Sequence, residues 1–126
     1  MAIGWDKRQR EIVSDAFRRF PWTENRCAAA ARAIFPVAVE VDARSRGLLL
    51  NAPHGARFII SKPPKKRYFD HHVLIEAQQH RVDAFTGEDG HDAASYVDTF
   101  WDFGHTLAVT EVDVQGVDPG IEQDET

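Results

Sequence analysis

The chain is poor in cysteine: its 126 residues include only Cys27, so one molecule cannot form an internal disulfide. That composition is typical of proteins from a reducing compartment. No apolar run approaches the roughly 18 residues that a membrane-spanning helix needs. The first residues also lack the apolar core of a secretory signal. We therefore expect a cytoplasmic protein without a membrane segment, and signal-independent export stays open.

Positive side chains are missing from the C-terminal part of the chain. All 15 lysine and arginine residues lie within residues 1–82, whereas residues 83–126 contain 12 acidic residues. Such opposite charge in two parts of one chain indicates either that the parts dock on each other or that the acidic part is a solvated tail. Residues 117–126 are acidic and have almost nothing to bury, so we expect a disordered tail after a single domain over residues 1–116.

Signals for nucleic acid, phosphate and metal binding are weak. The basic run at residues 62–67 is short and contains two prolines, and no stripe of spaced basic and aromatic residues accompanies it. The glycines form no phosphate-binding pattern. Adjacent His71 and His72 on a strand would point to opposite faces, and the close histidine pairs that zinc prefers are absent. We expect no nucleic acid, no metal and no cofactor.

Two helical patterns come first in the chain. Apolar residues recur at helical spacing over residues 5–20, with basic residues on the other face, and Pro21 ends the pattern. Thr23 or Asn25 can cap a second helix, which we expect to begin at Asn25 or Arg26 with Cys27 in its first turn. Four alanines follow Cys27 and continue this helix to Phe35, where Pro36 stops it.

The rest of the chain favours strands. The expected strands cover residues 37–41, 48–50, 57–61, 72–77, 80–85 and 107–112, with a loop at 86–90 and a helix at 91–101. The strands at 72–77 and 80–85 are separated by two glutamines and predict a hairpin. The whole pattern predicts an α+β domain, in which N-terminal helices pack on a mostly antiparallel β-sheet.

Three residues of this pattern carry candidate chemistry. Cys27 falls at the start of the second helix, where the helix dipole stabilises a thiolate. If residues 78–79 form a two-residue turn, His72 lies opposite Phe85, and Asp83 is its diagonal neighbour on the same face. A histidine held by an aspartate can deprotonate the thiol and later act as a general acid. For the three to meet, the sheet face that carries His72 must pack near the start of the second helix.

This order of residues resembles the papain-like and transglutaminase-like cysteine enzymes, especially small papain-fold toxin or effector domains of bacteria. In that superfamily the cysteine begins a helix, the histidine opens a later strand, and an Asp or Asn lies on the next strand. The matching residues are Cys27, His72 and Asp83, and the resemblance covers about residues 20–90. It implies a papain-like core and cysteine-dependent amide or acyl chemistry on a protein or peptide: a peptidase, deamidase or acyltransferase.

The oxyanion hole departs from that pattern. Papain has a glutamine shortly before its cysteine, and none lies close before Cys27. Asn25, or Trp22 through its indole N–H, is the expected substitute, with the cysteine's own backbone N–H as the other donor. His71 stays an alternative to His72, because a one-residue change in turn length exchanges the two faces.

Two other functions stay open. Free cysteines are among the most buried residues, and Cys27 shares a helical face with Ala31 and Ile34. It can therefore be a core residue of a non-enzymatic binding module, such as an adaptor or immunity protein, whose acidic part docks a basic partner. An RNA-cleaving toxin that uses His72 and a second histidine would need no cysteine. The expected partners are a protein or peptide substrate, a cognate inhibitor or a basic protein.

Overall fold

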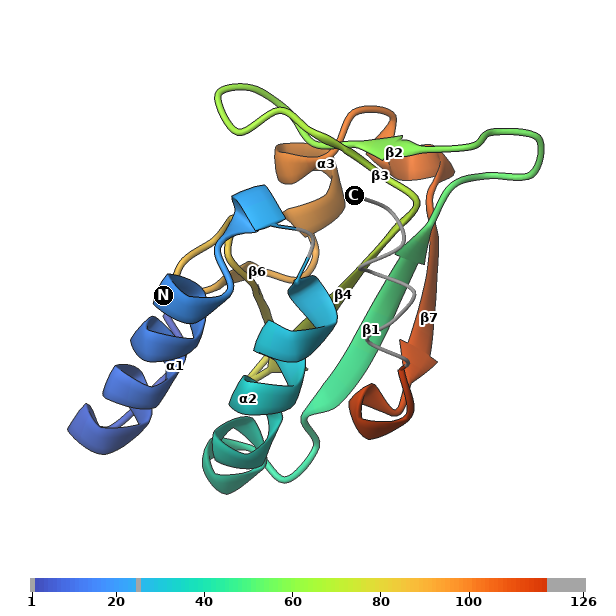
Figure 1. Cartoon of the computed structure of the whole chain (residues 1–126). Helices are drawn as coiled ribbons and strands as arrows, with labels where there is room; N and C mark the ends of the chain where they lie inside the picture. The colour runs from blue at the N-terminus through green and yellow to red at the C-terminus, as the bar shows by residue number, and fades with distance from the viewer. Residues whose placement is uncertain (1, 25, 118–126) are drawn as a thin grey trace.

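The predicted α+β class is confirmed by a computed structural model, which describes residues 2–24 and 26–117. Two N-terminal helices lie on one face of a mostly antiparallel five-stranded sheet (Figure 1). Asn25 and residues 118–126, which form nearly all of the predicted tail, lie outside the described residues. Within the described ranges, no helix is both long and apolar enough to cross a membrane.

Helix α1 covers Lys7–Arg19, within the predicted range. Its start is fixed by a capping box: the Asp6 carboxylate accepts the Gln9 backbone N–H at 2.7 Å, and the Gln9 side chain accepts the Asp6 N–H at 2.9 Å. Val13 and Ala16 are fully buried on the side that faces the rest of the domain. The amphipathic pattern therefore identified both the helix and its buried face.

Helix α2 covers Cys27–Val41, so the predicted stop at Pro36 and the predicted strand at 37–41 are wrong. Pro36 is exposed on the outer side of the helix, whereas Val37 and Ala38, the next two residues, are buried in the core. A proline inside a helix costs about 3 kcal/mol. Burial of apolar side chains, about 1.5–3 kcal/mol for a valine, offsets this cost and continues the helix.

The main sheet has the order β6-β5-β4-β1-β7, and every neighbouring pair is antiparallel. Its strands are β1 (Arg46–Asn51), β4 (His71–Ala77), β5 (His80–Val82), β6 (His91–Asp92) and β7 (Ala108–Val112). The predicted hairpin is confirmed: Ala77 pairs with His80, and Gln78 and Gln79 have positive φ angles of 50° and 62°. Two positive φ angles in a two-residue turn are the mark of type I′.

The remaining elements are short. They are β2 (Ile59–Ile60) and β3 (Tyr68–Phe69), which form a separate two-stranded sheet, helix α3 (Tyr96–Phe100), and the 3₁₀ turns η1 (Trp22–Glu24), η2 (Gly104–Thr106) and η3 (Val114–Gly116). The predicted helix at 91–101 is thus wrong in its first half, where residues 91–92 form β6 and residues 93–95 form a turn. The predicted strand at 57–61 is shorter than expected, and Ser61 makes an isolated bridge to Trp101 instead.

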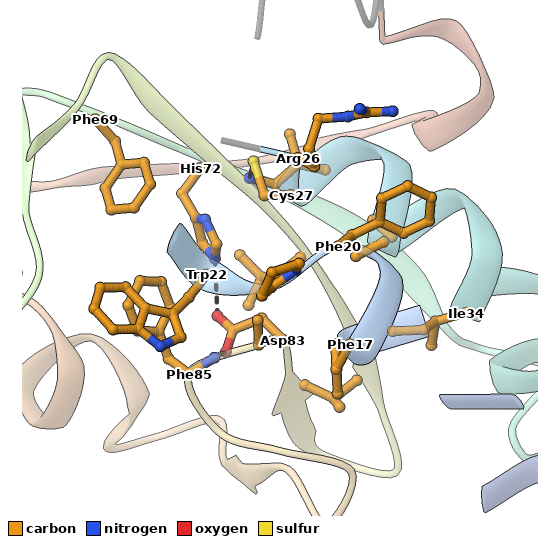
Figure 2. Close-up of a pocket in the computed structure, with 17 residues that line it drawn as sticks. Phe17, Phe20, Trp22, Arg26, Cys27, Ile34, Phe69, His72, Asp83 and Phe85 are labelled. Carbon is orange, nitrogen blue, oxygen red and sulfur yellow. Dashed lines mark hydrogen bonds and ion pairs between the residues drawn. The ribbon is translucent and has the colours of Figure 1, made fainter. Parts of the chain in front are cut away.

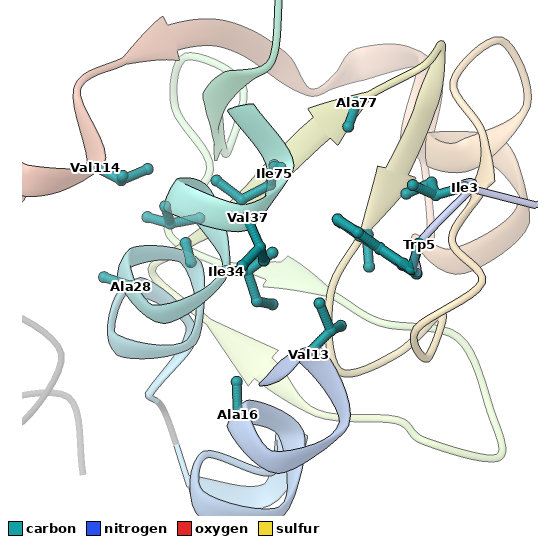
Figure 3. Close-up of a cluster of buried hydrophobic side chains, with 14 residues drawn as sticks. Ile3, Trp5, Val13, Ala16, Ala28, Ile34, Val37, Ile75, Ala77 and Val114 are labelled. Carbon is teal, nitrogen blue, oxygen red and sulfur yellow. The ribbon is translucent and has the colours of Figure 1, made fainter. Parts of the chain in front are cut away.

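Strand β4 separates two apolar clusters. Val73, Ile75 and Ala77 face α1 and α2 in the first cluster (Figure 3). Leu74 faces the second cluster, which lies on the other side of the sheet and includes Phe85, Tyr96 and Trp101. Because side chains alternate along a strand, His72 belongs to the face of Leu74. The predicted packing of α2 on the His72 face is therefore wrong: the helix covers the opposite face.

Candidate functional site

The candidate site lies at the edge of β4, beyond the end of β5. The register pairs β5 only with Ile75, Glu76 and Ala77, while β4 extends back to His71. Among the described strands, none covers this side of the first half of β4. The N–H of Val73 instead donates a hydrogen bond to Sγ of Cys27, at 3.4 Å. Cys27 thus reaches the sheet edge from one face, and His72 reaches the same edge from the other.

Cys27 lies in the first turn of α2, as predicted, and is the first residue of that helix. Its side chain is half-buried and packs against the first apolar cluster. The helix dipole and the N–H of Val73 both place partial positive charge at the sulfur.

His72 and Asp83 form a buried pair. Nε2 of His72 lies 2.8 Å from Oδ2 of Asp83, and the two residues are 2% and 4% exposed (Figure 2). The structure therefore brings together the histidine and the aspartate that the hairpin predicted. The predicted geometry is only partly right, because β5 ends at Val82. Asp83 lies in the turn that follows, and Phe85 is not in a strand opposite His72.

The turn around Asp83 supplies hydrogen bonds to its second oxygen. Oδ1 accepts the backbone N–H groups of Phe85 and Thr86, at 2.9 and 3.0 Å. Burial raises the pKa of Asp83, but the hydrogen bond and charge of His72, with hydrogen bonds from Tyr96 and Thr86, outweigh burial and lower the pKa below its ordinary value. Asp83 is therefore ionised, and Nε2 of His72 carries the proton that lies between them.

Tyr96 belongs to the candidate site but was not among the residues that the sequence indicated. Its hydroxyl donates to Oδ2 of Asp83 and accepts a hydrogen bond from Nε1 of Trp101 at 3.1 Å. Burial first, and the charge of Asp83 second, raise the pKa of Tyr96 well above its ordinary value. The hydroxyl stays protonated, and because it accepts from Trp101, its single hydrogen is directed to Asp83. The only sequence signal was that a buried tyrosine hydroxyl needs a partner.

Aromatic rings enclose the imidazole of His72. Its centroid lies 5.1 Å from that of Trp101, 5.5 Å from that of Phe85 and 6.0 Å from that of Phe69. These rings fix the plane of the imidazole and exclude water from the bond between His72 and Asp83. In such surroundings a hydrogen bond to a charged group is stronger than in water.

The other ring nitrogen of His72 is unused. Nδ1 is buried and has no hydrogen-bond partner among the described residues. His72 and Cys27 both line a cavity of about 20 Å³, which is space for about one water molecule. Figure 2 shows the sulfur of Cys27 on the side of the imidazole away from Asp83. Because Nε2 is held by Asp83, Nδ1 is the ring nitrogen left for a proton transfer.

Arg26, which the sequence analysis also missed, immediately precedes the cysteine. Its guanidinium lies 5.2 Å from the ring centroid of Phe20, and its buried Nε has no hydrogen-bond partner among the described residues.

The candidate oxyanion residues have different positions. Trp22 lines the same cavity, and its ring packs against Phe85 at 5.9 Å. Asn25 lies outside the described residues. His71 is half-buried at the start of β4, where alternation along the strand points it away from the face of His72. The oxyanion roles of Trp22 and Asn25 stay predictions.

No group of three or more His, Cys, Asp or Glu residues that could hold a metal ion occurs in the described part of the chain. A scan against protein-family models, a search of the curated proteins and a search of the solved structures each found no match.

Proposed function

We propose that this domain has a papain-like core and is a cysteine-dependent enzyme that acts on an amide or acyl group of a protein or peptide, with Cys27, His72 and Asp83 as its catalytic residues. The observation that carries the proposal is the state of His72. Its buried imidazole is tied to Asp83 through Nε2, its Nδ1 has no hydrogen-bond partner among the described residues, and His72 lines the same cavity as Cys27. A nucleophile, a base and a group that orients the base are the parts that covalent catalysis needs.

The first half of the reaction follows from this arrangement. Nδ1 of His72 takes the proton of the Cys27 thiol, and Asp83 stabilises the imidazolium. The thiolate attacks the carbonyl carbon, a C–S bond forms, and the negative charge moves to the oxygen. When the C–N bond breaks, His72 returns its proton from Nδ1 to the leaving amine or ammonia. The product is a thioester on Cys27.

The second half decides the type of enzyme. If water attacks the thioester, Nδ1 of His72 takes a proton from it, the C–S bond breaks with return of that proton to the sulfur, and a carboxylic acid leaves. This outcome is peptide hydrolysis or, for a glutamine side chain, deamidation. If an amine attacks instead, the outcome is acyl transfer. All three reactions use the same residues, so the site is compatible with a peptidase, a deamidase or an acyltransferase.

A role as a bacterial toxin or effector domain in the cytoplasm is part of the proposal. It is supported by the resemblance of the Cys27, His72 and Asp83 segments to small papain-fold toxin domains. A cognate inhibitor is then an expected partner, because the cell that makes such an enzyme must be protected from it.

A non-enzymatic binding module is the second candidate. It is favoured by the small cavity of about 20 Å³ and by the 2% exposure of His72, because a substrate must displace side chains to reach that ring. In this case Cys27 fills a gap beside the first apolar cluster, and the His72–Asp83 pair only orders the turn after β5.

Alkylation of the thiol separates the two candidates. Iodoacetamide should label Cys27 in the folded chain at pH 6–7 faster than it labels free cysteine, and His72→Ala should remove this advantage. The urea-unfolded chain, which contains the same thiol, is the matched control. Labelling no faster than that of free cysteine would overturn the proposal. Cys27→Ala should fold and lose activity, whereas a strongly destabilised variant that keeps its activity would favour a core role.

A further inference from the structure

The small sheet formed by β2 and β3 has two different faces. Ile59 pairs with Phe69, and both side chains are buried. Tyr68, which alternates with Phe69 along β3, is 55% exposed, and Phe58, just before β2, is 39% exposed. The inner face thus belongs to the core, while the outer face presents aromatic rings to solvent.

Cations flank these rings. The Arg57 guanidinium lies 5.0 Å from the ring centroid of Phe58, and the Lys66 ammonium lies 6.0 Å from that of Tyr68. The two rings lie 6.1 Å apart, so the four side chains form a continuous row of cation, ring, ring and cation. We call these four residues, together with Lys65, the aromatic–basic face.

The positive charge of this face is not neutralised by the domain. Residues 52–69 contain five basic residues and no acidic residue, in a chain whose net charge is −5. Lys62 and Arg67 are directed to the backbone carbonyls of Asp98 and Thr23. None of the five forms an ion pair with an acid of the described residues, whereas Arg8, Arg10, Arg46 and Arg81 all do.

We propose that the aromatic–basic face binds an acidic segment of a protein substrate. Carboxylates of that segment pair with Arg57, Lys65 and Lys66, and its apolar side chains pack on the exposed edges of Phe58 and Tyr68. Arginine and tyrosine are the residues that most often dominate protein interfaces. Opposite charge then steers the acidic segment to this face.

The same features argue against a nucleic acid. Three available cations are few compared with the roughly 6–10 phosphate contacts of a typical DNA-binding protein. Bases bind single-strand-binding proteins by stacking on open ring faces, and here cations lie at the rings of both Phe58 and Tyr68. The edges of the two rings stay accessible in this row, and these edges suit apolar side chains of a protein segment.

The position of the face identifies the partner as a substrate. Phe69, next to Tyr68 on β3, lies 6.0 Å from the imidazole of His72 on the inner side. Arg67 holds the η1 turn through Thr23, beside Trp22 of the catalytic cavity. A segment bound on the aromatic–basic face therefore lies close to the cavity. This assignment of the partner as substrate rests on the proposed function, but binding itself does not.

Binding can be tested without catalysis, with the full chain carrying Cys27→Ala. Fluorescence anisotropy would follow a fluorescein-labelled peptide rich in glutamate with interspersed leucines, and the same peptide with glutamine in place of glutamate. We expect saturable, salt-sensitive binding of the acidic peptide only. Tyr68→Ala, and separately Lys65→Glu with Lys66→Glu, should weaken binding about tenfold or more. The matched control, Arg18→Glu with Arg19→Glu on α1, changes the charge equally and should weaken it less than threefold.

Three results would overturn the inference: no saturable binding, equal weakening by the α1 control, or tighter binding of single-stranded DNA or of phosphatidylserine vesicles than of the acidic peptide. Circular dichroism of each variant shows that it is folded. The result is independent of the thiol labelling test. Peptide binding together with an unreactive Cys27 would support the binding role of the aromatic–basic face and reject the proposed enzyme. A reactive Cys27 without peptide binding would support the enzyme and reject the binding role.

Discussion

Tyr96 and His72 share one oxygen of Asp83: the tyrosine hydroxyl donates to Oδ2, which also lies 2.8 Å from Nε2 of the imidazole. With two backbone N–H groups on Oδ1, the carboxylate accepts four hydrogen bonds in a buried site. Tyr96 cannot turn away, because Trp101 donates to its hydroxyl. The orientation of His72 therefore depends on Tyr96 and Trp101, which do not line the cavity beside Cys27.

Tyr96→Phe should destabilise the fold and lower the rate at which the Cys27 thiol is alkylated. The substitution removes one donor from Asp83 and leaves Nε1 of Trp101 without its acceptor, at a cost of about 1–3 kcal/mol. Because the carboxylate is then held less firmly, we expect the iodoacetamide rate of Cys27 at pH 6 to fall several-fold. Urea unfolding and labelling kinetics measure the two effects.

Val97→Ala, at a half-buried neighbour on α3, is the control for this variant. It removes apolar packing from the same helix but no hydrogen bond, so it should lower stability and leave the labelling rate unchanged. Equal labelling rates in Tyr96→Phe and the wild type would show that Tyr96 stabilises the fold without positioning His72.

Asp83→Asn should be destabilising although the side chain keeps its shape. Four donors surround the carboxylate, and an amide has only one oxygen to accept them. Whichever way the amide turns, its NH₂ group meets donors, which leaves buried polar groups unsatisfied at about 1–3 kcal/mol each. Thermal and urea unfolding at pH 7 test this, and a stability equal to that of the wild type would show that the site can rearrange.

The same variant should also change the pH dependence of stability. The folded-state pKa of Asp83 is lowered, after burial has been outweighed by the hydrogen bonds. Its contribution to stability is therefore complete above the unfolded pKa of about 3.9 and is lost as the pH falls through the folded pKa. The difference in unfolding free energy between wild type and Asp83→Asn should be largest above about pH 4 and should shrink in more acidic solution. A constant difference down to acid unfolding would contradict the lowered pKa.

The hairpin shows what local sequence can predict. Two strands separated by two glutamines leave few choices of register, and the pairing of Ala77 with His80 is as expected. That register brought His72 and Asp83 close enough to bond. The start of α2 near Cys27 also followed from local signals, because alanines after a polar segment favour a helix start.

Long-range packing decided the features that sequence could not predict. The end of β5 at Val82 has a local cause that the strand pattern hid, because Oδ1 of Asp83 accepts the N–H groups two and three residues further on, as aspartates do in turns. The partner role of Tyr96 needs α3 to pack against the turn after β5, which is a tertiary contact. The face of β4 that α2 covers was also predicted wrongly, because alternation alone does not say which face a helix takes.

Gln79→Gly should stabilise the hairpin. Gln79 has a φ of 62°, a conformation that costs a side-chain-bearing residue about 1 kcal/mol and glycine little. We expect a gain of up to about 1 kcal/mol in urea unfolding. Gln78→Gly is the control: its φ is 50°, but its side chain accepts the Gly4 N–H at 2.8 Å, so that variant loses a contact and should gain less. If Gln78→Gly gains more, backbone strain does not set the stability of this turn.

Pro36→Ala should stabilise α2 at the position where the sequence predicted the end of the helix. Pro36 is exposed and lies inside the helix, where it has no N–H to donate to the carbonyl of Arg32. Alanine restores this donor and buries no polar group, and the upper limit of the gain is the cost of about 3 kcal/mol that proline has in a helix interior. Pro36→Gly restores the same donor but lowers helix propensity by about 1 kcal/mol relative to alanine, so it should gain less. A melting temperature that falls in Pro36→Ala would show that α2 is bent at this point to fit the sheet, and that a straight helix packs less well.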